Sequence, residues 1–211
     1  MVTAPPAGAP SPPIRDGGRM TLDEFFALPD SVRDEFDLLR GVVHRRNPPP
    51  DDNGVVVRDV FQCSCQARLD ATLAKWSDVR PGEHAVLSSE TGVRFDRSAS
   101  AVGMDAAVFA AGGASRDASD RRYVVGVPRL AVEILSFTDT FGGLLEKRRA
   151  YEAAGVPLVW VVDPDERAVT VYRPGERPRR MAEDDPVEGG DALPGFAVAA
   201  RDLFPPPPFD E

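Results

Sequence analysis

The fold follows from residues 127–164, which contain VPRLAVEILS (127–136), LLEKRRAYEAAGVP (144–157) and LVWVVDP (158–164). The first and last segments are short apolar runs, which predict buried strands. The middle segment predicts a helix that ends at Gly155, because glycine commonly terminates helices. This part of the chain therefore predicts a strand–helix–strand unit.

One acidic residue interrupts the first of these strands. Glu133 has apolar neighbours on both sides, and Lys147 lies on the helix that follows. Burying a carboxylate among apolar side chains costs free energy unless a metal or another cation compensates its charge. Glu133 therefore points to a metal-dependent active site.

Length and charge limit the classes of protein that fit. The chain has 211 residues, 42% of them hydrophobic, which suits one domain with tails and a sizeable core. Its net charge is −9 and its pI about 4.8. Proteins that bind nucleic acid through bulk electrostatics are usually basic, so any such contact here must use a local basic patch.

Two cysteines and the chain's hydropathy bear on its compartment. Cys63 and Cys65 are two apart in a predicted helix, so they do not face each other, and we expect reduced thiols. Prolines replace the apolar core of a secretory signal. No apolar run approaches the roughly 18 residues of a membrane span. We expect a cytoplasmic protein without membrane contact.

Composition divides the chain into a domain and two tails. Residues 1–19 are rich in Pro, Ala and Gly and predict a disordered N-terminal tail, and residues 205–211 predict a Pro-rich C-terminal tail. Residues 20–204 form the predicted domain. Further helices are expected at 21–28, where Thr21 and Glu24 form a capping box, and at 55–76.

The remaining predicted elements are strands and loops. A hairpin is expected over residues 34–43, and residues 112–122 predict a loop. The other strands are expected at 85–93, 101–110, 168–172 and 196–198. Strands mixed with two principal helices indicate one α/β domain with a mixed sheet.

Three carboxylates and one amine form the candidate site. Asp105 lies in an apolar strand, Glu133 in the next strongly apolar strand, and Asp37 in the first hairpin. Mg²⁺ binds through one or two carboxylates and keeps several waters and phosphate oxygens. A lysine beside the metal, here Lys147, can orient water or stabilise charge on a phosphate. The set therefore fits hydrolysis of a phosphodiester.

Each member also has an ordinary structural interpretation. Asp105 could end a strand at a turn, and Lys147 could be a solvated helix lysine. Glu133 could form a structural ion pair with Arg129 or Arg148. Acid spacing alone carries no sharp pattern, so these interpretations stay open.

Some neighbouring residues are secondary candidates. Tyr151 lies one helical turn after Lys147 and either bonds near the site or packs against the sheet. Ser136 is expected to cap the following helix. The pairs Arg121-Arg122 and Arg179-Arg180 are candidate phosphate contacts, although arginine pairs on loops are ordinarily solvated.

The order of the motifs resembles the Uma2 family (the DUF820 group), endonucleases of the PD-(D/E)XK superfamily. The resemblance runs from about Met20 to Phe204. The matching segments are MTLDEFFALP (20–29), FDLLRG (36–41), VEILS (132–136), EK (146–147) with Tyr151, AGVP (154–157), VWVVDP (159–164) and LPGF (193–196).

The resemblance implies a restriction endonuclease-like fold and hydrolysis of DNA with Mg²⁺ or Mn²⁺. It assigns Asp105 and Glu133 as metal ligands and Lys147 as the catalytic lysine, moved from the strand to the helix. Asp37 falls where the family usually has a glutamate that helps to position the metal or the lysine. All four are the expected catalytic residues.

The chain departs from the family pattern around the site. Met104 replaces the proline before Asp105, Arg129 stands where an aspartate is common, and Phe137 replaces a proline. Residues 138–143 replace a more basic loop, which removes expected phosphate contacts. Substrate affinity is therefore affected more than metal binding.

Two other classes of protein compete with a nuclease. One is a nuclease fold without catalytic activity that acts as a binding module, which the acidic charge and the altered loop favour. The other is a purely structural domain in which Glu133 forms an ion pair. A homodimer would suit cleavage of both strands of a duplex. The sequence does not distinguish DNA from RNA.

Overall fold

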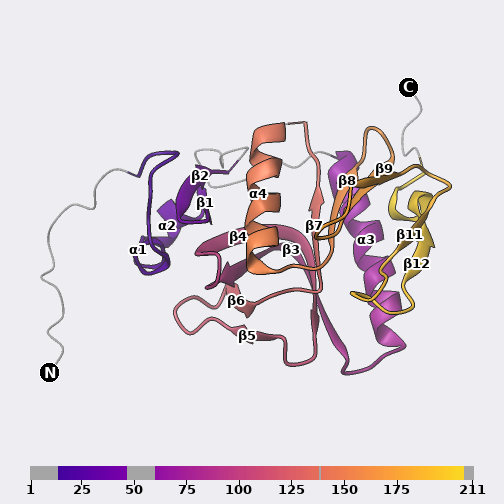
Figure 1. Ribbon diagram of the computed structural model, residues 1–211, viewed down its shortest axis with the longest axis horizontal. Helices are drawn as coiled ribbons and strands as arrows, with labels where there is room; N and C mark the ends of the chain where they lie inside the picture. Colours follow the sequence, from indigo (N-terminus) through magenta and orange to yellow (C-terminus); the bar gives the residue numbers. More distant parts are fainter. Residues whose placement is uncertain (1–13, 47–59, 138, 207–211) are drawn as a thin grey trace, which may run out of the picture.

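The computed structural model describes residues 14–46, 60–137 and 139–206, and these form a mixed α/β domain around a large sheet (Figure 1). The strand order is β10-β9-β8-β7-β4-β3-β6-β5, with the β1–β2 hairpin paired to β4. These strands are β1 (Phe36–Leu39), β2 (Val42–Arg45), β3 (His84–Phe95), β4 (Ser100–Ala110), β5 (Ala114–Arg116), β6 (Tyr123–Gly126), β7 (Leu130–Ile134), β8 (Val159–Asp163), β9 (Ala168–Tyr172) and β10 (Arg179–Met181). A separate pair joins β11 (Pro186–Glu188) to β12 (Ala197–Ala199).

The helices are α1 (Leu22–Phe26), α2 (Asp30–Arg33), α3 (Val60–Asp78) and α4 (Phe141–Ala154), with a 3₁₀ turn, η1 (Ala200–Leu203). No helix of the described ranges is long and apolar enough to cross a membrane. The mixed sheet and the helices confirm the predicted fold class.

The predicted strand–helix–strand unit is present as β7, α4 and β8. The two strands pair in parallel, with Glu133 opposite Val161. Thr140 caps the start of α4 by accepting a hydrogen bond from the Gly143 N–H. Gly155 ends the helix in the left-handed conformation, with φ 92°. Because side chains alternate along a strand, Glu133 shares a face of β7 with Ala131, which packs beneath α4.

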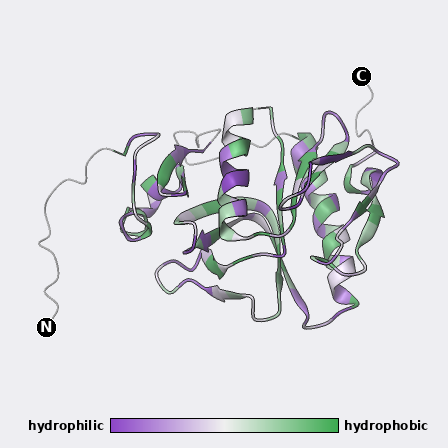
Figure 2. Ribbon diagram, viewed as in Figure 1, coloured by the Kyte–Doolittle hydropathy of each residue, from purple (hydrophilic) through white to green (hydrophobic). Residues whose placement is uncertain are grey.

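The two long helices cover hydrophobic cores built on the sheet. Leu69, Leu73 and Trp76 of α3 pack in the same core as Leu130 and Val132. On α4, Ala150, Tyr151 and Ala154 belong to a second core, with Val102, Phe109 and Ala131 among its members. The hydrophilic stretch of α4 in Figure 2 corresponds to residues 146–149, which lie between its two apolar ends.

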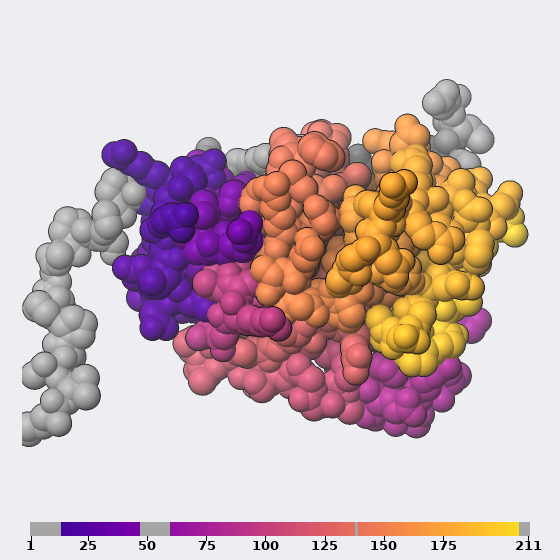
Figure 3. Space-filling view, in the orientation of Figure 1, coloured from indigo at the N-terminus to yellow at the C-terminus, as the bar shows by residue number. Residues whose placement is uncertain are grey.

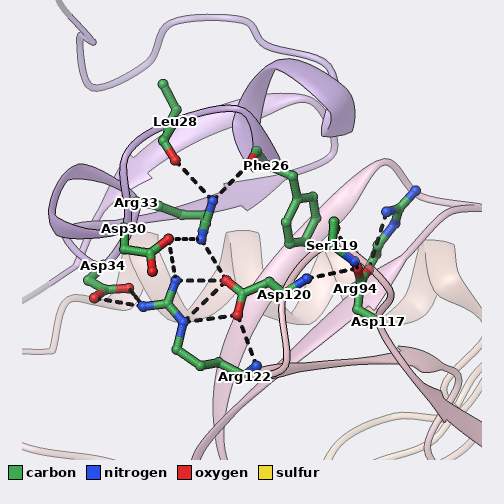
Figure 4. A network of polar contacts seen from close by, with 10 residues as sticks. All are labelled: Phe26, Leu28, Asp30, Arg33, Asp34, Arg94, Asp117, Ser119, Asp120 and Arg122. Atoms are coloured by element: carbon green, nitrogen blue, oxygen red, sulfur yellow. Dashed lines mark hydrogen bonds and ion pairs between the residues drawn. The ribbon is translucent and has the colours of Figure 1, made fainter.

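The N-terminal part is held to the sheet by a network of ion pairs (Figure 4). Arg33, on α2, lies 2.6 Å from Asp120 and also pairs with Asp30. Its guanidinium donates to the Phe26 and Leu28 carbonyls at 2.9 and 3.1 Å. This network ties α1 and α2 to the segment before β6.

Residues 14–19 of the predicted N-terminal tail are ordered against the hairpin. The Gly17 N–H donates to the Val43 carbonyl at 2.8 Å, and Arg19 forms a β-bridge with Val42. The free edge of β2 supplies these backbone partners, because an unpaired strand edge attracts additional chain. The remainder of that predicted tail lies outside the described residues.

Several short elements were not predicted. They are α2, β5, β6, β10 and β11, each of three or four residues. Elements this short show no hydrophobic period, and pairing with neighbours decides their conformation. The predicted loop at 112–122 therefore contains a strand.

The helix predicted at 55–76 runs to Asp78, and its predicted start falls outside the described residues. In the described structure no disulfide joins Cys63, which is exposed, to Cys65, which is buried.

Candidate active site

Glu133 is buried beside the cation that the sequence singled out. Glu133 is 7% exposed, and the Lys147 amine lies 2.7 Å from the Glu133 Oε2 atom. The Tyr151 hydroxyl donates a hydrogen bond to the other carboxylate oxygen, Oε1. Among the described residues, neither Arg129 nor Arg148 bonds to this carboxylate. Tyr151 is also fully buried, so it both packs against the sheet and bonds at the site.

Lys147 reaches from α4 to the strands below. Its side chain is 26% exposed, and its amine lies 3.4 Å from the Gly103 carbonyl in addition to its bond with Glu133. Burial lowers the pKa of Lys147, but the charges of Glu133, Asp37 and Asp105 outweigh burial and raise it. The surrounding carboxylates therefore favour the protonated, positively charged form of Lys147.

The electrostatics of Glu133 differ from those of an ordinary surface glutamate. Burial raises the pKa of Glu133, while Lys147 and Tyr151 oppose that rise and the charge of Asp105 adds to it, so that the pKa stands at about 7. The carboxylate is therefore costly to ionise even with Lys147 at hydrogen-bond distance. Additional positive charge near Glu133 would relieve this cost.

Asp105 lies directly beside the end of β7. Its Oδ2 atom accepts a hydrogen bond of 2.7 Å from the Ile134 N–H, and its backbone carbonyl accepts one of 3.0 Å from Gln66. The residue is 5% exposed and is not among those that line the cleft described below. The structure thus places Asp105 next to Glu133, beneath the surface.

Asp37 is held by two donors. Its Oδ1 atom accepts a hydrogen bond of 2.9 Å from Arg46 and one of 3.1 Å from the Gly103 N–H. Burial lowers the pKa of Arg46, but the Asp37 charge and, more weakly, the Glu90 charge raise it overall. Asp37 and Arg46 therefore form a firm pair at the edge of the site.

Gly103 and Arg46 are the two contributors that sequence reasoning missed. Gly103 joins two site residues, because its N–H bonds to Asp37 and its carbonyl to Lys147. A Cβ there would lie 3.2 Å from Arg46 and 3.0 Å from Glu90. A glycine inside an otherwise apolar strand often marks such a close approach, and this was the available signal.

Ser136 has a different role from the expected one. Thr140 is the N-cap of α4. The Ser136 N–H and hydroxyl both donate to the Asp139 carboxylate at 2.8 Å. Ser136 therefore shapes the loop before the helix, because its side chain closes a turn with Asp139 instead of capping α4.

A cleft of about 270 Å³ opens above these groups, and its lining includes Asp37, Glu133 and Lys147. Carboxylate oxygens are the ligands that Mg²⁺ and Mn²⁺ prefer, so the donors fit a hard divalent cation in kind. The described residues contain no group of three His, Cys, Asp or Glu side chains placed to hold a metal. A metal would therefore have one or two carboxylates from this site and take its other ligands from water or substrate.

The fold and this site define a nuclease-like α/β protein. Over 88% of this chain and 97% of the other, the structure matches the crystal structure of "a putative nuclease belonging to DUF820" from Anabaena variabilis ATCC 29413, with a TM-score of 0.71 and 19% sequence identity. No curated protein matches the chain. The family model of Uma2, described as "Putative restriction endonuclease", matches residues 22–201. The chain therefore belongs to the Uma2 family, and family and fold together support a nuclease.

Proposed function

We propose that this protein is a metal-dependent endonuclease that hydrolyses DNA phosphodiester bonds. The observation that carries the proposal is the 2.7 Å pair of Glu133 and Lys147 in a cleft that also contains Asp37. Family membership supplies the reaction class, and the chemistry of the side chains supplies the roles. A cytoplasmic location and a homodimer remain predictions from the sequence.

Asp105 and Glu133 are the residues that would hold Mg²⁺ or Mn²⁺. When bound, such an ion polarises the phosphate and lowers the pKa of a coordinated water. Both carboxylates come from paired strands of the sheet, and the Ile134 N–H orients Asp105. A rigid sheet keeps ligands in place more accurately than loops do.

Lys147 has the charge and position for a second role. Its raised pKa keeps the amine protonated, so it stabilises negative charge that develops on the phosphate and can orient the attacking water. Tyr151 and the Gly103 carbonyl fix the two partners of this pair. Asp37 contributes by its charge toward Lys147, and Arg46 holds Asp37 in place.

The test is cleavage of a supercoiled plasmid and of a circular single-stranded DNA, each with Mg²⁺ or Mn²⁺. We expect wild type to open at least one of these circles and expect Asp105→Asn, Glu133→Gln and Lys147→Ala to leave both intact. Arg149→Ala is the matched control, since Arg149 is on the same helix but pairs with Glu146 at the surface. Folded wild type that cuts neither circle with either metal contradicts the proposal.

The binding module is the second candidate. The net charge of −9 and the replaced loop at 138–143 favour it. Titration calorimetry with Mg²⁺ and Mn²⁺ separates the two functions. A nuclease should bind metal in a way that the Asp105→Asn/Glu133→Gln double variant abolishes, whereas a binding module should show no carboxylate-dependent binding.

A further inference from the structure

The buried face of α3 contains amide side chains among apolar ones. The buried residues of this helix are Gln62, Cys65, Leu69, Leu73 and Trp76. Gln66 follows Gln62 by one helical turn and is partly buried. An amide is costly to bury unless it forms hydrogen bonds, so the partners of these two glutamines show what the helix uses them for.

Both glutamines bond to the backbone beside the proposed metal ligands. The Gln62 side-chain amide donates to the Ile134 carbonyl at 3.2 Å, and Ile134 directly follows Glu133. The Gln66 side-chain amide donates to the Asp105 carbonyl at 3.0 Å. Each glutamine therefore ties α3 to one of the two strands that carry the carboxylates.

The main-chain ladder between β4 and β7 ends just before these carboxylates. Its last pair at this end joins Ala106 to Val132. Asp105 and Glu133 are the next residues of the two strands and lie beyond that pair. A side-chain bond links the strands there, from the Ile134 N–H to the Asp105 Oδ2 atom at 2.7 Å. The positions of the two carboxylates therefore depend on side-chain bonds as well as on the ladder.

The helix α3 holds these strand ends from the face of the sheet opposite α4. Ala106 and Val132 belong to the core that includes α3, whereas their neighbours Ala107 and Ala131 belong to the core that includes α4. Alternate residues of a strand point to opposite faces, so the two helices lie on opposite sides of β4 and β7. Figure 3 shows the side on which α4 lies at the surface. One helix therefore contacts the Glu133 carboxylate, and the other contacts the backbone from behind.

We propose that Gln62 and Gln66 are positioning residues, which hold Asp105 and Glu133 in place for a divalent cation. The inference rests on the proposed function and adds two residues to its site. The Asp70 carboxylate accepts a further hydrogen bond from the Gln66 amide at 2.9 Å, which fixes the direction of that amide. Hydrogen bonds that hold metal ligands in place contribute to metal affinity, because a ligand that moves freely binds less tightly.

The first test is the affinity for Mn²⁺, measured by titration calorimetry on the full chain. Gln62→Met and Gln66→Met keep a side chain of similar length and remove its donor. We expect each variant to bind Mn²⁺ about tenfold more weakly than wild type, the usual order for losing a bond that supports a ligand. Gln62→Asn and Gln66→Asn, which keep the amide and shorten its reach, replace a methionine variant that does not fold. Affinity equal to wild type in both variants overturns the proposal.

Trp76→Phe is the matched control at the other end of α3. The Trp76 indole donates to the Pro194 carbonyl at 3.2 Å, so this change also removes a bond from the buried face of the helix to a backbone carbonyl. We expect Trp76→Phe to lower the urea midpoint of unfolding in EDTA and to leave the Mn²⁺ affinity unchanged. If it weakens Mn²⁺ binding as much as Gln66→Met does, general loosening of α3 explains the effect and the proposal fails.

Hydrogen exchange tests the positioning role without metal. The Ile134 N–H is bonded to Asp105, so its exchange rate, measured by NMR, reports how firmly that carboxylate is held. In EDTA we expect this amide to exchange about fivefold faster in Gln66→Met than in wild type, the order of one lost hydrogen bond. An unchanged rate shows that Gln66 does not hold Asp105 and overturns its positioning role.

Failure of this inference differs from failure of the proposed function. Wild type that cuts the circles, while both glutamine variants keep its Mn²⁺ affinity, leaves the nuclease intact and removes the positioning role. Wild type that cuts neither circle, yet binds Mn²⁺ through its carboxylates more tightly than the glutamine variants do, removes the nuclease and keeps the positioning role. Folded wild type that binds no Mn²⁺ overturns both.

Discussion

Two regions of this protein bury charged side chains, and they balance those charges in opposite ways. In the N-terminal network, Asp120 meets two guanidinium groups, Arg33 at 2.6 Å and Arg122 at 2.7 Å (Figure 4). The bonds from Arg122, against opposition from burial, lower the pKa of Asp120 to about 2. In the cleft, Glu133 meets one ammonium, and burial raises its pKa to about 7.

This difference shows which region compensates its buried charges with its own side chains and which region does not. The network satisfies its carboxylate with cations from two elements, so its role is to join α2 to the sheet. In the cleft, Asp37 pairs with Arg46, while Glu133 and Asp105 both act on the charge of Lys147, so three carboxylates face two cations and negative charge is in excess. Such an excess is costly in a folded protein unless a cation is recruited.

The largest effect we expect is a loss of folding stability when the N-terminal network is broken. Arg33→Ala removes its bonds to Asp120, Asp30 and two carbonyls, and it leaves a buried carboxylate with one cation fewer. We expect the free energy of unfolding to fall by about 3 kcal/mol or more. Urea denaturation measures it. A change below about 1 kcal/mol would show that Arg122 alone suffices and would remove the contrast.

Lys147→Ala should have its main effect on the reaction and a smaller one on stability. Removing a charge that stabilises the transition state costs about 10²–10³ in rate. Initial rates of DNA cleavage measure this, with Arg149→Ala as the control on the same helix. A variant that unfolds instead would place Lys147 in the same structural role as Arg33.

Glu133→Gln should change how stability depends on pH. The folded pKa of Glu133, about 7, is above the ordinary value of 4.5, so the folded state binds the proton more tightly. Stability from this group is present below pH 4.5 and is lost as pH rises through 7. Glutamine resembles the protonated acid, so the variant should be more stable than wild type by about 3 kcal/mol at pH 8.

The comparison for Glu133→Gln is chemical denaturation in EDTA at pH 4 and pH 8. We expect the advantage of the variant at pH 8 to vanish at pH 4, where wild-type Glu133 is also protonated. A variant less stable than wild type at pH 8 would indicate a structural ion pair, the interpretation that the sequence left open.

The smallest effect should come from a surface ion pair of similar composition. Arg201 pairs with Asp184, and the two side chains are 60% and 84% exposed. Arg201→Ala should change the free energy of unfolding by less than about 1 kcal/mol, because water and salt screen exposed charges. A larger loss would mean that burial is not what distinguishes the Arg33 network.

Much of the sheet could be predicted from the sequence, because the signals for its main strands lie within short stretches of neighbouring residues. Leu130 to Ile134 and Val159 to Asp163 are apolar enough to be strands by themselves. Thr21 with Glu24 and the glycine at 155 mark helix ends through bonds within a few residues. The short strand Ala114–Arg116 has no such signal, because it exists only through pairing with β6.

For the site, the sequence indicated residue types and the structure decided their partners. Glu133 and Lys147 stood out because the sequence alone shows a charged residue within an apolar strand and a lysine on the helix that follows. The roles of Arg46 and Gly103 depend on contacts with Asp37, and Gly103 is 66 residues away from it. No local pattern records a bond across that separation.

The sequence by itself determined the strand–helix–strand unit, the class of the fold and the four acidic and basic candidates, since these follow from hydropathy and side-chain chemistry. Only the tertiary structure decided that Tyr151 and Lys147 share the oxygens of Glu133, and that Asp105 lies beneath the cleft. It also decided that two glutamines of α3 bond to the backbone beside these carboxylates. The physical reason is that hydropathy and helix ends depend on near neighbours, whereas burial and the balance of charge depend on how distant strands pack.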